Sequence, residues 1–126
     1  MQKYNPLKAP DPEEWLAIDE HERIDMVVEY HRRKRIRIPG MEAHAAFHVT
    51  VENQIALGDE TPVKRKLEQL MNEGLDRHDA IHAIAWILSQ QVYRALKYKK
   101  SSDLGKSYYA ALEDLTAENW LNSVKD

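Results

Sequence analysis

The sequence predicts an all-α fold, an up-down helical bundle of about four core helices with an extended N-terminal arm and a helical C-terminal tail. Apolar residues recur at intervals of three and four in several segments, as on one face of a helix. Glycine, proline and aspartate separate these segments at the positions where helices stop and start. No segment convincingly shows the alternation of a half-buried strand. At 126 residues we expect one domain, residues 1–126.

The N-terminal part is expected to be an arm followed by short helices. Residues 1–12 contain Pro6, Pro10 and Pro12 and cannot form one regular element, so an extended arm is predicted there, with Tyr4 and Leu7 as docking side chains. The helical core should cover residues 13–98. A short helix opens at Trp15 and Leu16. The next begins at Asp19, which has the capping-box spacing with Glu22, and should end before IRIPG.

Further helices are expected over about 41–57, 61–73 and 77–98. Gly58 and Gly74 stop the first two, Pro62 occupies the first position of the second, and Asp76 caps the third. The tail, residues 101–126, should be one helix broken near Thr116. Connections this short favour antiparallel packing of successive helices.

Composition excludes several function classes. Lys and Arg number 18 and Asp and Glu 21, which gives a net charge of −3. The basic clusters HRRKRIR (31–37) and KYKK (97–100) fall at predicted helix ends, where cations are favoured, so we interpret them as solvated helix ends rather than a nucleic-acid site. Without cysteine, any metal must be held by imidazole or oxygen. No apolar run resembles a signal peptide or a span of about 18 residues, so we expect a cytoplasmic protein without membrane contact.

Histidines in two segments have the spacing of metal ligands. HAAFHVTVENQ (44–54) places His44, His48 and Glu52 at intervals of four, and RHDAIH (77–82) does the same for His78 and His82. Residues four apart project from one helix face, so each pair can offer two ligands to one ion.

The predicted helix directions bring the two pairs together. Helix 61–73 carries the chain back, so helices 41–57 and 77–98 should run the same way, with the pairs about 3 Å apart in height. The helix before them runs the other way and brings His31 to this level. The candidate metal ligands are therefore His31, His44, His48, Glu52, His78 and His82.

A divalent transition metal ion is the partner that best explains these residues. Burying Glu52 and several imidazoles without partners would be costly. Zinc or iron suits a nitrogen-rich site, and an open position would support metal-assisted hydrolysis or redox chemistry. Glu52 is either a ligand or a catalytic base. A hydrogen-bonded network of His, Glu and water is the alternative. Tyr30, Gln54 and Asp79 are outer-shell candidates, and His21 is assigned to the surface.

The stretch from HAAFH to AIHAIAWIL, within residues 41–95, is similar to an uncharacterised bacterial family, the domain of unknown function numbered eighteen forty-one. The resemblance rests on HxxxHxxxExQ followed by HxAxH, and implies a compact helical domain of no known activity. The family pattern falls on His44, His48, Glu52, Gln54, His78 and His82. A looser likeness is to hemerythrin-type bundles, which pair HxxxE with HxxxH. Their further HxxxxD is missing here, because no histidine follows His82.

The non-enzymatic alternative rests on aromatic residues near the two ends of the chain. Trp15, Tyr108, Tyr109 and Trp120, with the proline-containing arm, would form the docking surface of an adaptor or a homodimer subunit. The same residues can instead cover the protein's own core. An adaptor should tolerate His48→Ala apart from a packing cost, whereas a metal protein should lose its metal.

Overall fold

The computed structural model describes residues 3–98 and 104–125, which form seven α-helices and one short 3-10 helix. No strand is present in these two ranges, which confirms the all-α prediction. The elements are α1 (Pro12–Ala17), α2 (Glu20–Arg33), α3 (Met41–Ala56), η1 (Gly58–Glu60), α4 (Val63–Asn72), α5 (Arg77–Tyr98), α6 (Leu104–Asp114) and α7 (Ala117–Lys125).

Polar side chains begin three of the helices, and for α2 and α5 they do so where the sequence predicts, whereas α1 begins earlier than predicted. The Asp11 carboxylate accepts a hydrogen bond from the Glu14 amide, so α1 starts at Pro12, at the last position predicted for the arm. Asp19 caps α2 by accepting from the His21 amide. The Asp76 carboxylate accepts from the amide of Asp79 at 2.7 Å and so caps the start of α5.

The break in the tail is also confirmed. Helices α6 and α7 are separated at Leu115 and Thr116, and the Thr116 hydroxyl accepts from the Asn119 amide at 3.0 Å. The buried Lys66 side chain of α4 donates to the carbonyl oxygen of Leu115 at 2.9 Å. This hydrogen bond connects the break between α6 and α7 to α4.

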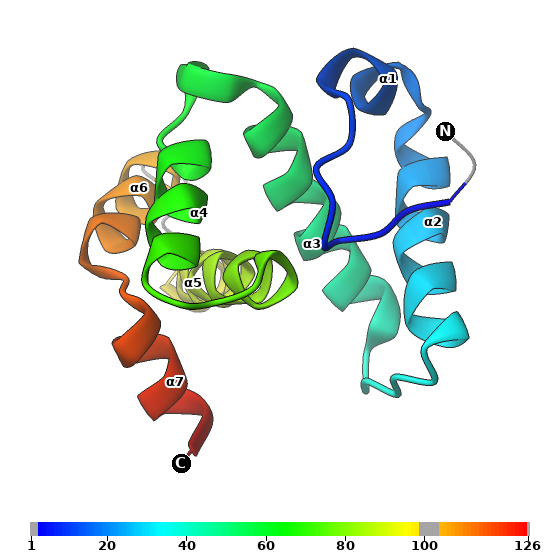
Figure 1. The fold of residues 1–126 in the computed structure, drawn as a ribbon. Coiled ribbons are helices and arrows are strands. Elements are labelled where there is room, and N and C mark those ends of the chain that lie inside the picture. Colours follow the sequence, from blue (N-terminus) through cyan, green and yellow to red (C-terminus); the bar gives the residue numbers. More distant parts are fainter. Residues whose placement is uncertain (1–2, 99–103, 126) are drawn as a thin grey trace.

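Helices α3 and α5 cross rather than run side by side. Figure 1 shows α2, α3 and α4 from the side and α5 nearly end-on. The predicted parallel arrangement of the two histidine-bearing helices therefore differs from the structure. The reversal at α4 redirects the chain across α3 as well as turning it back, which helix spacing alone does not specify.

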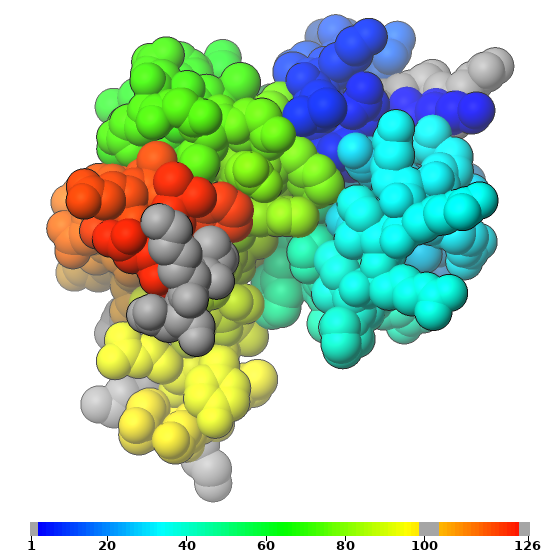
Figure 2. Space-filling view, turned by 60° about the horizontal axis from the view of Figure 1, so that its bottom comes forward, coloured from blue at the N-terminus to red at the C-terminus, as the bar shows by residue number. Residues whose placement is uncertain are grey.

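The core consists of two hydrophobic clusters that share α3. The first, here called the α5 cluster, includes Val51 of α3 and residues of α4, α5, α6 and the start of α7. The second, the arm cluster, consists of Tyr4, Trp15, Val27, Tyr30, Ala45 and Val49. Figure 2 shows the corresponding parts of the chain side by side, blue and cyan on one side and green to red on the other.

The aromatic residues of the adaptor hypothesis lie on the protein's own core. Trp15 is fully buried and donates to the Asn53 side chain at 2.9 Å, and Tyr108 is buried and donates to Gln54 at 2.8 Å. Tyr109 and Trp120 are partly buried against the α5 cluster. These four side chains thus help to build the core, although Tyr109 and Trp120 stay partly accessible.

The predictions about nucleic acid and membrane are tested only in part by the structure. Residues 32–37 of the first basic cluster are exposed, and in the second, Lys99 and Lys100 lie outside the described residues. Within the described part of the chain, no helix combines the length and apolar character needed to cross a bilayer.

Candidate metal centre

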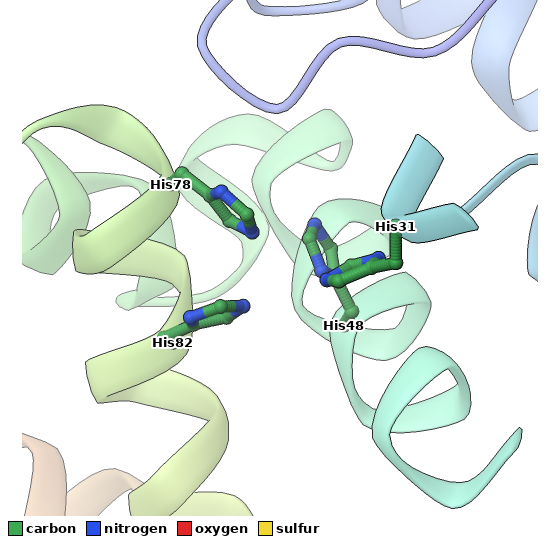
Figure 3. Close-up of side chains that lie close together, drawn as sticks. All are labelled: His31, His48, His78 and His82. Atoms are coloured by element: carbon green, nitrogen blue, oxygen red, sulfur yellow. The ribbon is translucent and has the colours of Figure 1, made fainter. Parts of the chain in front are cut away.

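Five histidines from three helices gather where the two hydrophobic clusters meet. His31 comes from the last turn of α2, His44 and His48 from α3, and His78 and His82 from the first turns of α5. Figure 3 shows the imidazoles of His78 and His82 pointing toward those of His31 and His48. One nitrogen from each of these four rings lies within 4.8 Å of the others. The His44 ring completes the group, 4.8 Å from the His82 ring and 5.0 Å from the His31 ring between centroids.

Hydrogen bonding fixes the proton of His31 on the side away from the cluster. Its Nδ1 lies 2.8 Å from the carbonyl oxygen of Val27, one helical turn earlier. A carbonyl oxygen can only accept, so Nδ1 carries the hydrogen and Nε2 is left with a lone pair. That Nε2 is buried and has no hydrogen-bond partner.

The same reasoning assigns the proton of His48. The Tyr4 hydroxyl lies between His48 Nε2, at 2.7 Å, and the Glu52 carboxylate. Arg77 donates to both oxygens of Glu52, at 2.8 and 2.7 Å, which keeps Glu52 an acceptor. The single Tyr4 proton therefore goes to Glu52, and the Tyr4 oxygen accepts from His48 Nε2. His48 is left with a bare Nδ1, which is buried and unpartnered.

The remaining three imidazoles add to this pattern. Nε2 of His44, of His78 and of His82 is buried without a hydrogen-bond partner. Among the described residues these five ring nitrogens are the only buried side-chain polar atoms left unpaired. Folded proteins pair nearly all such atoms, because each unpaired one costs about 1–3 kcal/mol. Five such nitrogens therefore gather in one place, and the proton assignments above leave a lone pair on those of His31 and His48.

Burial favours the neutral form of four of these rings, those of His44, His48, His78 and His82. Burial first, and neighbouring imidazoles second, lower the pKa of His82 to about 3 and that of His78 to about 4. Burial likewise lowers the pKa of His44 and brings that of His48 well below its usual range. Neutral imidazole is the form that binds metals, so these four rings are in the form that can bind a cation at neutral pH.

The geometry of the group fits one ion after a small contraction. Bonds of about 2.0–2.1 Å in a tetrahedral site place neighbouring nitrogens about 3.3 Å apart. The four nitrogens lie within 4.8 Å of one another, so the set would have to contract by at most about 1.5 Å to bind one ion. The cluster of His31, His48, His78 and His82 can therefore hold a metal ion, and its all-nitrogen donor set suits zinc, iron, nickel or copper.

Glu52 lies beside this group, but its carboxylate faces other partners. It is 1% exposed and forms a two-point ion pair with Arg77, which is 5% exposed. Its link to the histidines runs through Tyr4. The sequence reasoning missed Arg77, although a cation directly before His78 is a natural partner for a buried carboxylate. Tyr4 docks as predicted, whereas Leu7 is exposed.

The other expected residues divide between the site and its surroundings. The Tyr30 ring packs edge-on against the rings of His31 and His78, at 5.6 and 5.5 Å. Gln54 instead accepts from Tyr108. His21 is exposed, as predicted.

Comparison with known proteins gives one match. The family model described as "Domain of unknown function (DUF1841)" covers residues 12–114, more of the chain than the motifs quoted above. No curated protein and no solved structure matches, and the likeness to hemerythrin-type bundles is not supported. Tyr4 precedes the matched residues, while all five clustered histidines, Glu52 and Arg77 lie within them. Because the match spans most of the sequence, the chain belongs to the DUF1841 family.

Proposed function

We propose that this domain binds one divalent transition metal ion, zinc or iron, through His31, His48, His78 and His82, with His44 as a fifth donor. One observation carries the proposal: five buried imidazole nitrogens without hydrogen-bond partners converge from three helices. Two of them, on His31 and His48, are lone pairs by the proton assignment above. A cation is the partner that several converging lone pairs favour.

The alternative of a hydrogen-bonded His and Glu network has less support. Such a network needs donors facing acceptors, but the bare nitrogens of His31 and His48 both face the cluster. Glu52 belongs to a separate network with Arg77 and Tyr4 that is already satisfied. We therefore propose that Glu52 acts on the site through Tyr4 and His48, rather than as a ligand or a free base.

The ion would join α2 to α5, two helices that make few direct contacts with each other. His31 belongs to α2, on the arm-cluster side, and His78 and His82 belong to α5, in the other cluster. Coordination from both would contribute to stability as structural metals do. Metal-assisted hydrolysis or redox chemistry is the further hypothesis, and it requires one coordination position for water or substrate.

Elemental analysis of untagged protein tests the proposal. After supply of zinc or ferrous iron and removal of the excess, we expect about one ion per chain in the wild type. His48→Ala and His82→Ala should lose the metal. His21→Ala is the matched control, because His21 is exposed and outside the cluster, and it should retain the metal.

Two results would contradict the proposal. The first is substoichiometric metal in the wild type after supply of both ions. The second is metal retained equally by His48→Ala, His82→Ala and the wild type, which would mean that the ion binds elsewhere. An adaptor without a metal would lose only packing energy in His48→Ala, and its metal content would be negligible throughout.

A further inference from the structure

The N-terminal arm reaches the histidine cluster through one side chain. Figure 1 shows the arm, in dark blue, running from α2 to α3 and then turning toward α1. Tyr4 is 1% exposed, while its neighbours Lys3 and Asn5 are exposed. The Tyr4 ring packs on Trp15 and on His48, each with 5.4 Å between ring centroids, and its hydroxyl contacts His48 and Glu52.

The other polar anchors of the arm are few. Arg77 donates to the carbonyl oxygen of Pro6 at 2.9 Å, and Arg33 donates to that of Tyr4 at 3.2 Å. Lys3, Asn5 and residues 7–9 are exposed. Pro6 is buried as well. The arm is therefore anchored by Pro6, by Arg33, and by Tyr4 with the Arg77 and Glu52 pair, and the last three residues also orient His48.

We propose that the arm is a latch whose docking is coupled to metal binding, and that Tyr4 is the positioning residue that transmits the coupling to His48. The inference rests on the proposed metal site. The coupling passes through one hydrogen bond, from His48 Nε2 to the Tyr4 oxygen.

The physical link is the chemistry of the imidazole ring. A metal bound at Nδ1 withdraws electron density, so Nε2–H becomes a stronger donor and its bond to Tyr4 strengthens. In return, the acceptor at Tyr4 holds His48 in the one tautomer with a free Nδ1 and raises its basicity as a ligand. Because binding free energies are linked, the metal must favour arm docking by the same factor by which docking favours the metal.

The matched variants are Tyr4→Phe and Tyr30→Phe. Both tyrosines are buried beside the histidines and lose only a hydroxyl group, but the hydroxyl of Tyr30 makes no hydrogen bond to an imidazole. We measure Zn²⁺ affinity by competition with a chromogenic chelator, and the optical spectrum of the Co²⁺-loaded protein. Tyr4→Phe should weaken Zn²⁺ binding by roughly 10–100-fold and alter the Co²⁺ spectrum, whereas Tyr30→Phe should change neither. Thermal unfolding of both variants checks that they fold.

Proteolysis provides a second readout, which can be taken on the wild type itself. Lys3 and Lys8 flank the Tyr4 anchor and are exposed, so trypsin can report on release of the arm. Zn²⁺ should slow cleavage at these two sites in the wild type by roughly the factor lost in Tyr4→Phe, and should have no such effect in that variant.

The outcomes separate the latch from the metal site. If the wild type binds Zn²⁺ but Tyr4→Phe binds it equally well, or if the metal leaves cleavage at Lys3 and Lys8 unchanged, the latch is overturned and the metal site stands. If the wild type binds neither Zn²⁺ nor ferrous iron, both proposals fall.

Discussion

The buried ion pair of Arg77 and Glu52 yields a prediction that requires no metal. Arg77→Met removes two hydrogen bonds to Glu52 and one to the Pro6 carbonyl. The carboxylate, 1% exposed, would then keep only the Tyr4 hydroxyl as a partner. Breaking such a pair from one side costs about 3–5 kcal/mol, because the remaining charge stays buried. Small domains are stable by about 5–15 kcal/mol, so the loss is a large fraction of the total.

The assay is urea unfolding in the presence of EDTA, followed by tryptophan fluorescence and far-UV circular dichroism. Arg32→Met is the matched control, because Arg32 pairs with Glu29 at the surface, where the two side chains are 73% and 51% exposed. That pair should contribute less than about 1 kcal/mol. Adding Glu52→Gln to Arg77→Met should restore part of the lost stability, since it removes the unpaired charge. A cost below about 1 kcal/mol for Arg77→Met, or one equal to that of Arg32→Met, would refute the reasoning.

Two further predictions concern the imidazoles. In metal-free protein the free energy of unfolding should fall as pH falls from 6.5 toward about 4. The pKa of His78 is about 4 and that of His82 about 3 in the folded state, so the unfolded chain binds more protons in this window. Urea midpoints measured at intervals of half a pH unit test the sign, and stability that rises on acidification contradicts it. Second, His82→Leu should abolish metal binding but leave the metal-free protein equally stable, or more stable by about 1 kcal/mol, because it replaces an unpaired buried nitrogen with apolar atoms. It should also reduce the pH slope by at most about 1.4 kcal/mol per pH unit, and an unchanged slope would mean that His82 is not buried neutral.

Much of the helical plan could be read from local signals. Asp11, Asp19 and Asp76 precede helices, and Thr116 marks the break in the tail, because each offers a side-chain oxygen to amides of the first turn. These interactions involve residues two or three apart, so sequence spacing determines them. The crossing of α3 and α5 depends on packing between distant segments, and spacing does not reveal it.

The gathering of the histidines was predicted, but the helix geometry expected to produce it differs from the structure. The four-residue spacing placed His44 with His48 and His78 with His82, and the return of the chain at α4 brought the pairs together. His31 joins them as expected from the antiparallel course of α2. The helices meet by crossing, however, so agreement on proximity does not validate the parallel geometry.

The role of Glu52 required knowledge of partners far away in the sequence. A buried carboxylate at the spacing of a ligand suggests a metal when its neighbours are unknown. The structure supplies Arg77, 25 residues later, and Tyr4, 48 residues earlier. Neither separation corresponds to a periodic pattern within one helix, so only the fold reveals that this charge is already compensated.

The Arg77, Glu52 and Tyr4 network and the histidine cluster differ in how far their hydrogen bonds are satisfied. Arg77, Glu52 and Tyr4 satisfy one another, so their network stabilises the protein without a ligand. Among the five imidazoles, His31 Nδ1 and His48 Nε2 have hydrogen-bond partners in the protein. Five other ring nitrogens, one on each imidazole, are buried and have none. Packing alone gives no reason to keep them, because apolar side chains of similar volume would fill the space at lower cost. Such a cost, concentrated at one point where α2, α3 and α5 meet, is the pattern expected when stability is given up for a binding site.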